Sequence, residues 1–195
     1  MLPRSGAVRL DLAVKDRSLL KACRTLEAGP CAMSIPAPYE RFEGEVLPEW
    51  IDWNGHMNLA YYVVLFDRAT DLLFDELGLG LDYRRIEEKG TFVVETHNRY
   101  ERELLVGERV RVATQILGCD DKRLHLGHEM FRSATGERAA TQELMFLHID
   151  MRARRVSPFP PGLRERVADR DCRQPIYRTF SRNADFRLKA LRLRR

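Results

Sequence analysis

Residues 52–77 read DWNGHMNLAYYVVLFDRATDLLFDEL, a polar, glycine-centred segment followed by a regular apolar pattern. In the second part, apolar side chains recur every three or four positions, at Leu59, Tyr62, Val63, Phe66, Ala69, Leu73 and Leu77. This period predicts one helix of about five turns with a single apolar stripe. Asn58 is well placed to be its N-cap, and Gly78 to end it. Residues 52–58 are therefore predicted to form a loop that leads directly into a long helix.

Strand patterns flank this loop and helix. We expect one strand over residues 43–51, and after Gly90 the apolar period shortens to two. Four further strands are predicted near residues 91–100, 110–116, 124–130 and 140–148, with turn-forming residues between them. Because short turns favour antiparallel pairing, we expect these four strands to form a meander. The predicted fold class is α+β, with one long central helix wrapped by an antiparallel sheet of about five strands.

The length of 195 residues suits a single core, since one domain usually has roughly 100 to 200 residues. We interpret residues 1–38 as an N-terminal extension, either disordered or a mis-assigned start with Met33 as the first residue. Residues 39–160 form the predicted domain and 161–195 a basic tail. Asp11, Lys15, Asp16 and Arg17 interrupt the longest apolar stretch of the N-terminus, so no signal peptide is expected. No run reaches the roughly 18 apolar residues of a spanning helix, so no membrane span is expected.

The net charge of +4 is unevenly divided. Residues 152–195 contain fourteen basic and four acidic side chains, a net of +10, which leaves 19 basic and 25 acidic in residues 1–151, a net of −6. A basic tail can meet the phosphates of a nucleotide ligand, acidic lipid or nucleic acid, or stay solvated. The four cysteines, at 23, 31, 119 and 172, are scattered and predict free thiols in a cytoplasmic protein. Neither a metal site nor a cofactor is expected.

The loop carries polar side chains at alternate positions: Asp52, Asn54, His56 and Asn58. Backbone N–H groups at a helix start have no internal partners and can hold a negative oxygen. A carboxylate beside them can activate water or attack as a nucleophile. Gly55 lets the backbone approach a ligand closely. These are the parts of an acyl-transfer site, although the same residue types also occur in purely structural loops.

The motif Asp52-x-Asn54-Gly55-His56-Met57-Asn58, followed by Tyr61-Tyr62, resembles the active-site loop of the 4-hydroxybenzoyl-CoA thioesterase-like hotdog enzymes. Its asparagine-histidine-asparagine part is also similar to the loop of plant acyl-ACP thioesterases. Over residues 43–160 the chain looks closest to betainyl-CoA thioesterases, through segments 93–97, 102–103, 120–125 and 140–143. The resemblance implies a hotdog fold and an acyl-CoA substrate, hydrolysed to free acid and CoA.

The resemblance also implies roles for single residues. Asp52 would be the catalytic carboxylate, with His56 and Asn54 completing the catalytic set. Substrate-binding residues would be Gly55, Met57, Asn58, Tyr61 and Glu95. The family forms homodimers or dimers of dimers whose sites borrow residues from the partner, and Glu95 and His97 are the candidates for that. Asp52 could act as a general base or as a nucleophile, and the acyl group could be betainyl or another short chain.

Two other functions stay open. A hotdog hydratase or dehydratase normally pairs an aspartate with a histidine five positions on, whereas His56 follows Asp52 by four. A non-catalytic acyl-CoA-binding regulator would use the basic tail on nucleic acid, a partner that we do not expect. The chain has no GxSxG, GxxxxGK[ST] or GxGxxG motif, which leaves serine hydrolase, nucleotide hydrolase and dinucleotide redox chemistry without their usual signatures.

Overall fold

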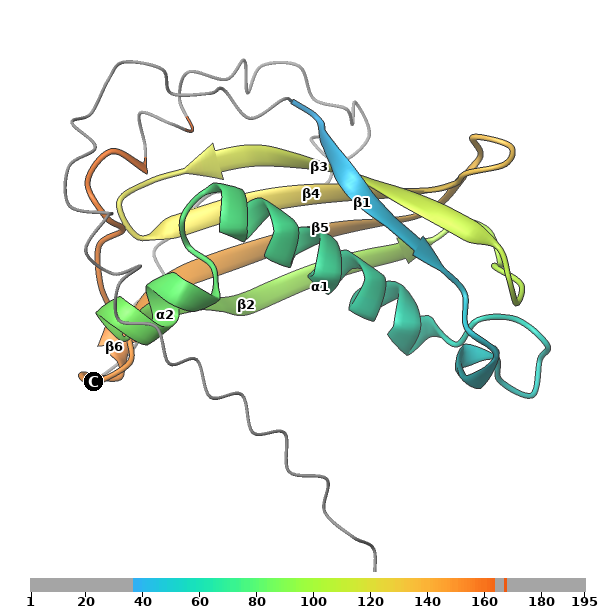
Figure 1. Ribbon diagram of the computed structural model, residues 1–195, viewed down its shortest axis with the longest axis horizontal. Coiled ribbons are helices and arrows are strands. Elements are labelled where there is room, and N and C mark those ends of the chain that lie inside the picture. Colours follow the sequence, from blue (N-terminus) through green and yellow to red (C-terminus); the bar gives the residue numbers. More distant parts are fainter. Residues whose placement is uncertain (1–36, 164–166, 168–195) are drawn as a thin grey trace, which may run out of the picture. The chain divides into compact units, whose positions relative to one another are not determined.

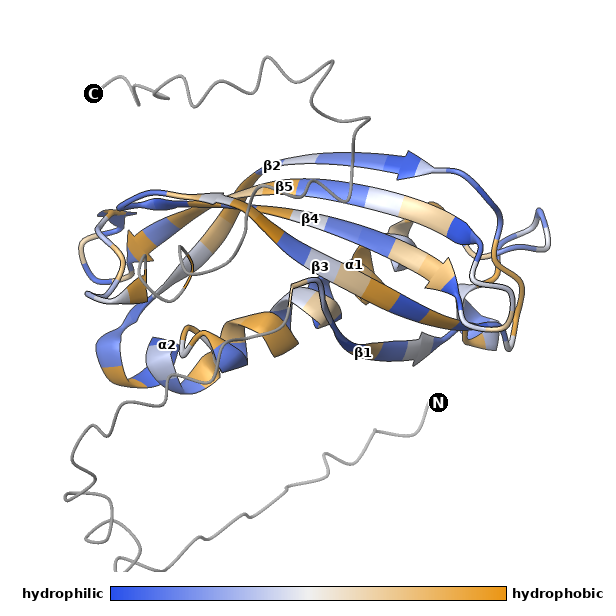
Figure 2. Ribbon diagram, turned by 90° about the horizontal axis from the view of Figure 1, so that it is seen from above, coloured by the Kyte–Doolittle hydropathy of each residue, from blue (hydrophilic) through white to orange (hydrophobic). Residues whose placement is uncertain are grey.

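The computed structural model describes residues 37–163 and Val167. Their elements are β1 (Tyr39–Glu45), a 3-10 helix η2 (Pro48–Trp50), α1 (Leu59–Glu76), α2 (Leu81–Glu87), β2 (Lys89–Tyr100), β3 (Arg109–Cys119), β4 (Arg123–Arg132), β5 (Arg138–Asp150) and β6 (Arg155–Val156). The strands form one antiparallel sheet in the order β1-β3-β4-β5-β2, with β6 paired to β5. Helix α1 lies across one face of this curled sheet, with α2 on the same side (Figures 1 and 2).

The sheet order corrects the predicted meander. β3, β4 and β5 do follow one another, but β2 pairs with β5 and not with the next strand, β3. The free edge of β3 is occupied by β1, so β2 takes the opposite edge of the sheet. Residues 101–108 connect the two distant strands, and the buried Leu104 anchors that connection in the core. The sequence shows which segments are strands, but not which strand lies beside which.

Helix α1 begins and ends where the apolar period predicts. The Asn58 side chain accepts a hydrogen bond from the Ala60 N–H at 3.0 Å, so this residue is the N-cap. Gly78 follows the helix with a φ of 66°, in the left-handed region that favours glycine. A second helix, α2, corrects the expectation of a single helix. None of its residues is buried, so it has no apolar stripe by which the sequence could reveal it.

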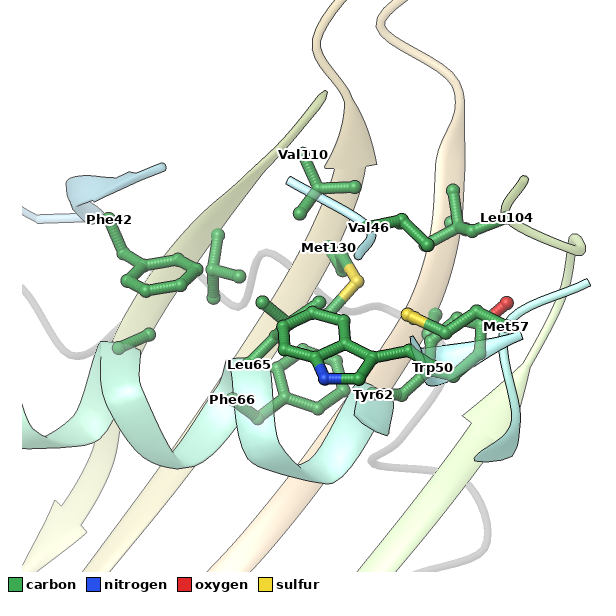
Figure 3. Packing of buried hydrophobic residues seen from close by; sticks show 14 residues of the cluster. Phe42, Val46, Trp50, Met57, Tyr62, Leu65, Phe66, Leu104, Val110 and Met130 are labelled. Carbon is green, nitrogen blue, oxygen red and sulfur yellow. The ribbon is translucent and has the colours of Figure 1, made fainter. Parts of the chain in front are cut away.

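The predicted strand over residues 43–51 is wrong after Glu45, and the observed strand begins earlier, at Tyr39. β1 ends at Glu45, and Pro48–Trp50 form a 3-10 turn. Proline has no N–H for a sheet, and its fixed φ suits the first turn of a helix. The turn directs Trp50 inward, where it is only 5% exposed and packs over the start of α1 (Figure 3).

The core between α1 and the sheet consists of two apolar clusters. One surrounds the N-terminal half of α1 and includes Trp50, Met57, Tyr62, Leu65, Phe66, Leu104, Val110 and Met130 (Figure 3). The other surrounds its C-terminal half and includes Leu73, Phe74, Leu77, Leu124, Leu126, Leu144 and Phe146. Full burial of each Leu or Phe contributes about 1.5–3 kcal/mol to folding, so this helix-on-sheet contact supplies much of the stabilisation.

A row of polar side chains crosses the sheet between the two clusters. In register, Thr114 on β3 lies opposite His128 on β4, His128 opposite Gln142 on β5, and Gln142 opposite Asn98 on β2. His128 bonds Thr114 at 2.9 Å and Thr70 of α1 at 3.0 Å, and the Gln142 amide donates to Asn98 Oδ1 at 2.8 Å. The row therefore brings polar groups into an otherwise apolar interface and runs toward the β2 edge.

Candidate active site

The loop between η2 and α1 is closed by its own backbone. Ile51 and Met57 form an isolated antiparallel bridge, and the Asp52 N–H donates to His56 O at 3.1 Å. Within this bridge, the Gly55 N–H donates to Asp52 O at 3.0 Å and closes a four-residue turn. Gly55 has a φ of 81° with open space around its Cβ position. In this chain the glycine is therefore required by the backbone conformation of the turn, and not by a close neighbour.

The Asp52 carboxylate is half-buried and held at both oxygens. Oδ1 accepts the Asn54 N–H at 2.8 Å, and Oδ2 lies 3.4 Å from the Asn58 Nδ2, a long and weaker contact. Asn58 thus has two functions, since its Oδ1 caps the Ala60 N–H while its amide faces the carboxylate. The carboxylate is thereby placed at the N-terminal end of α1, where the helix dipole favours negative charge.

The structure reduces the number of backbone N–H groups that can bind an oxyanion. Three of those between residues 55 and 58 are already bonded inside the chain: Gly55 to Asp52 O, Met57 to Leu104 O at 2.7 Å, and Asn58 to Trp50 O at 2.9 Å. In the described part of the chain, the N–H groups of His56 and Leu59 have no hydrogen-bond acceptor. These two donors, on either side of Asn58, can accept a developing oxyanion.

The other two predicted catalytic side chains do not contact Asp52. His56 is half-buried, and its Nδ1 lies 3.4 Å from Met57 O. The Asn54 side chain is exposed, and this residue reaches Asp52 through its backbone N–H. Within residues 37–163, no hydrogen bond joins the Asp52 carboxylate to the His56 ring. The catalytic roles of His56 and Asn54 stay predictions.

Three aromatic or apolar residues next to the loop serve the core. Met57 is 1% exposed and packs in the first cluster, so its expected contact with substrate stays a prediction. Tyr61 is half-buried and stacks on Trp50 with ring centroids 5.1 Å apart. Tyr62 is a core residue, as its position in the apolar stripe indicated. It donates to Arg102 O at 3.1 Å, and burial raises its pKa to about 12.

The comparisons with known proteins agree with this architecture. The family model of the thioesterase-like superfamily matches residues 46–167. The chain belongs to this superfamily. Over 126 residues it is 39% identical to the betainyl-CoA thioesterase of Pseudomonas aeruginosa, a match that covers 65% of this chain and 79% of that protein. The resemblance to hotdog thioesterases that the loop motif indicates is therefore confirmed.

Two further proteins are similar to this superfamily member. The chain is 41% identical over 126 residues to the L-carnitine dehydrogenase/betainyl-CoA thioesterase of Agrobacterium fabrum. This match covers 65% of the chain and 26% of that protein. A hypothetical protein of Staphylococcus aureus, solved in complex with CoA, has a TM-score of 0.64 and 31% identity, covering 70% of this chain and 85% of that one. No helix within the described residues of this superfamily member is long and apolar enough to cross a membrane.

In this thioesterase-like chain, Glu95 lies on a different face of the sheet from α1. It pairs with Met145, whereas the neighbouring positions Leu144 and Phe146 face the core. His97 shares the face of Glu95 and pairs with Glu143. Within one protomer the sheet therefore separates the Glu95 side chain from the Asp52 loop. A substrate contact for Glu95 requires a second copy of the chain and stays a prediction.

The face toward α1 carries polar residues that the sequence reasoning did not select, namely Asn98 and Gln142. Gln142 is 2% exposed, and its Oε1 is buried with no hydrogen-bond partner among the described atoms. The signal was present in the alternation of strand 140–148, which places Gln142 on the same face as Leu144 and Phe146. A buried polar residue at such a position indicates a specific structural or functional role.

Proposed function

We propose that the protein is an acyl-CoA thioesterase that hydrolyses betainyl-CoA, or another short acyl-CoA, to the free acid and CoA. One observation carries the proposal. The Asp52 carboxylate is fixed at the start of α1 by Asn54 and Asn58, beside two available backbone N–H groups. The identity to a betainyl-CoA thioesterase supports the same activity, and the CoA complex of a similar protein supports the CoA ester.

The chemistry follows from this placement. The thioester oxygen binds near the N–H groups of His56 and Leu59, which lowers the energy of the tetrahedral oxyanion. In one route Asp52 takes a proton from water as the water oxygen bonds to the carbonyl carbon. In the other, Asp52 attacks that carbon itself, and water then hydrolyses the anhydride. In both, the carbon–sulfur bond breaks and the proton released from water ends on the leaving thiolate, which restores the Asp52 carboxylate that Asn58 holds in position.

The β2 edge supports a homodimer, alone or as part of a dimer of dimers. Among the described strands, β2 pairs only with β5, so its other edge has no strand beside it. This edge carries three consecutive exposed apolar residues: Phe92, Val93 and Val94, at 49%, 44% and 46% exposure. A long apolar edge strand is a site of pairing with another chain. Pairing of β2 with its copy would make α1 the central helix of each half of a continuous sheet.

The cytoplasm is the compartment that we propose for this reaction. The four cysteines of the sequence are scattered and form no CxxC pair, which favours thiols over a disulfide framework. Free thiols are typical of a reducing compartment. Reducing the protein with a thiol should therefore leave its stability and activity unchanged.

Thiol release from a panel of acyl-CoAs tests the function. The panel contains betainyl, acetyl, aromatic and long-chain thioesters, and the proteins are wild type, Asp52→Asn and Asp67→Asn. Asp67 is an exposed aspartate on α1 and gives the same chemical change away from the loop. Loss of the base is expected to lower kcat by roughly 10²- to 10⁴-fold for Asp52→Asn alone. Normal turnover by folded Asp52→Asn, or no turnover of any acyl-CoA by the wild type, would sink the proposal.

A further inference from the structure

Trp53 is the most exposed large hydrophobic side chain in the described residues, at 96% exposure. It directly follows Asp52 in the turn that Gly55 closes. Exposed single apolar residues are common on protein surfaces, but a tryptophan carries the largest aromatic face and is enriched at binding sites. Because Trp53 directly follows the central carboxylate of the site, its exposed ring is a candidate for contact with the substrate.

The turn restrains the backbone position of Trp53. The Gly55 N–H bonds Asp52 O and the Asn54 N–H bonds Asp52 Oδ1, so the backbone on both sides of Trp53 is restrained. The Cα atoms of Asp52 and Trp53 are consecutive and lie about 3.8 Å apart, so both side chains leave the same turn. A ligand atom beside Asp52 is thus within reach of the ring face.

The other aromatic residues at this end of α1 each contact another ring. Trp50 stacks on Tyr61, and the Arg68 guanidinium lies 5.5 Å from the Trp50 ring centroid. Tyr62 is buried and packs edge-on against Tyr100, with centroids 5.2 Å apart. No ring contact to Trp53 occurs within the described residues. Among the aromatic residues around the loop, Trp53 therefore has the most exposed ring and the one with no ring contact among the described residues.

The proposed substrate defines what that ligand group must be. A betainyl group ends in a quaternary ammonium, which has no N–H and cannot be recognised by ordinary hydrogen bonds. Such cations bind to aromatic faces, within about 6 Å of the ring centroid, and tryptophan is the best of these. One methylene joins the ammonium to the thioester carbonyl, so a carbonyl at Asp52 places the cation next to the following residue.

We propose that the indole face of Trp53 binds the quaternary ammonium of the acyl group and sets the preference for a cationic acyl-CoA over a neutral one of the same shape. This inference rests on the proposed thioesterase function and names the residue that selects its substrate. The Asp52 carboxylate adds a negative charge next to Trp53 in the chain, so the two adjacent residues combine an aromatic face with an anion.

A matched pair of thioesters separates charge from shape. 3,3-Dimethylbutanoyl-CoA carries a tert-butyl group where betainyl-CoA carries trimethylammonium, so the two substrates differ in one atom and one charge. We would measure kcat/KM for both with the wild type, Trp53→Leu, Trp53→Phe and the control Ile86→Ala. Ile86 is an exposed apolar residue of α2, at 77% exposure. Because Trp53 is nearly fully exposed, its variants should fold, which circular dichroism verifies.

We expect the wild type to prefer betainyl-CoA, and Trp53→Leu to reduce this preference by roughly 2- to 30-fold, the range that a cation–π contact supplies. Trp53→Phe should retain part of the preference and Ile86→Ala all of it. The inference is overturned if the wild type has no preference, or if Trp53→Leu leaves the ratio unchanged. It is also overturned if both substrates lose equally, as when Trp53 contacts a partner subunit, which light scattering would show. Each of these results leaves the thioesterase intact, whereas no hydrolysis of any acyl-CoA refutes the proposed function itself.

Discussion

His128 makes the stability of the fold depend on pH in a way that can be calculated. Its side chain is fully buried in the polar row, with Phe66 stacked on it at 5.5 Å. Burial lowers its pKa from 6.5 to about 3. The Thr70 hydroxyl donates its proton to Phe66 O at 3.1 Å, so Nε2–H of His128 donates to Thr70 and Nδ1 accepts from Thr114. The neutral Nε2–H tautomer of His128 thus satisfies both ring nitrogens and the hydroxyls of Thr70 and Thr114.

The sign of the effect follows from the lowered pKa. Below pH 6.5 the unfolded chain binds a proton at this histidine, while the folded chain cannot do so until the pH approaches 3. The free energy of unfolding therefore falls with decreasing pH, by about 1.4 kcal/mol for each pH unit below 6.5. At pH 4.5 the loss is about 2.7 kcal/mol, a large part of a typical stability of about 5–15 kcal/mol.

The variant His128→Gln isolates this contribution, because glutamine has a donor and an acceptor but does not titrate. We would measure urea unfolding of both proteins at pH 7.5 and pH 4.5, at one protein concentration. The wild type should lose about 2.7 kcal/mol more than the variant between the two pH values, since the other titrating groups contribute equally to both. Equal losses would refute the assignment of a neutral, buried His128.

Three other changes give expected outcomes. Asn58→Ala should lower the free energy of unfolding by about 1 kcal/mol and also lower kcat, whereas Asn58→Asp keeps the cap; an unchanged kcat in Asn58→Ala would show that this amide does not position Asp52. Gly55→Ala should cost about 1–2 kcal/mol in thermal unfolding, with Gly55→Asn costing less, because the φ of 81° is strained for alanine. Val94→Lys should convert the proposed dimer to a monomer in light scattering, because charge on an edge strand opposes pairing; an intact dimer would place the interface elsewhere.

The sequence predicts the elements of this fold where burial imposes a period. α1 was predictable because Tyr62, Phe66, Ala69, Leu73 and Leu77 of the predicted stripe are all buried, although Leu59 and Val63 of the same stripe are exposed. β3, β4 and β5 were predictable because alternate residues enter the core, whereas Gly90 is the one buried residue of β2. α2 escaped prediction because none of its residues is buried. The position of β2 beside β5 also escaped, since pairing between distant strands depends on which edges are already occupied and not on the local pattern.

For the site, the spacing of the loop residues allowed a prediction, but the hydrogen bonds of these residues could not be predicted from the sequence. Asn58 is both a helix cap and a neighbour of Asp52, which follows from a loop that ends at the helix start. Which N–H groups remain available depends on segments far away in sequence. Leu104 O binds the Met57 N–H, and no pattern near residue 57 reveals an acceptor 47 positions later. The polar row across β2–β5 needs the strand register, which only the folded sheet provides.

The bond between Met57 and Leu104 also connects the active-site loop to the proposed dimer edge. Leu104 lies four residues after the end of β2, and Arg102 in the same connection accepts the Tyr62 hydroxyl. The position of Asp52 relative to α1 is therefore supported by a segment whose other end is the edge strand. If β2 pairs with its copy, this pairing restrains the connection and, through it, the loop. We expect the Val94→Lys monomer to lose hydrolysis together with dimerisation, at the same protein concentrations. Full activity in the monomer would mean that η2 and α1 alone hold the loop in place.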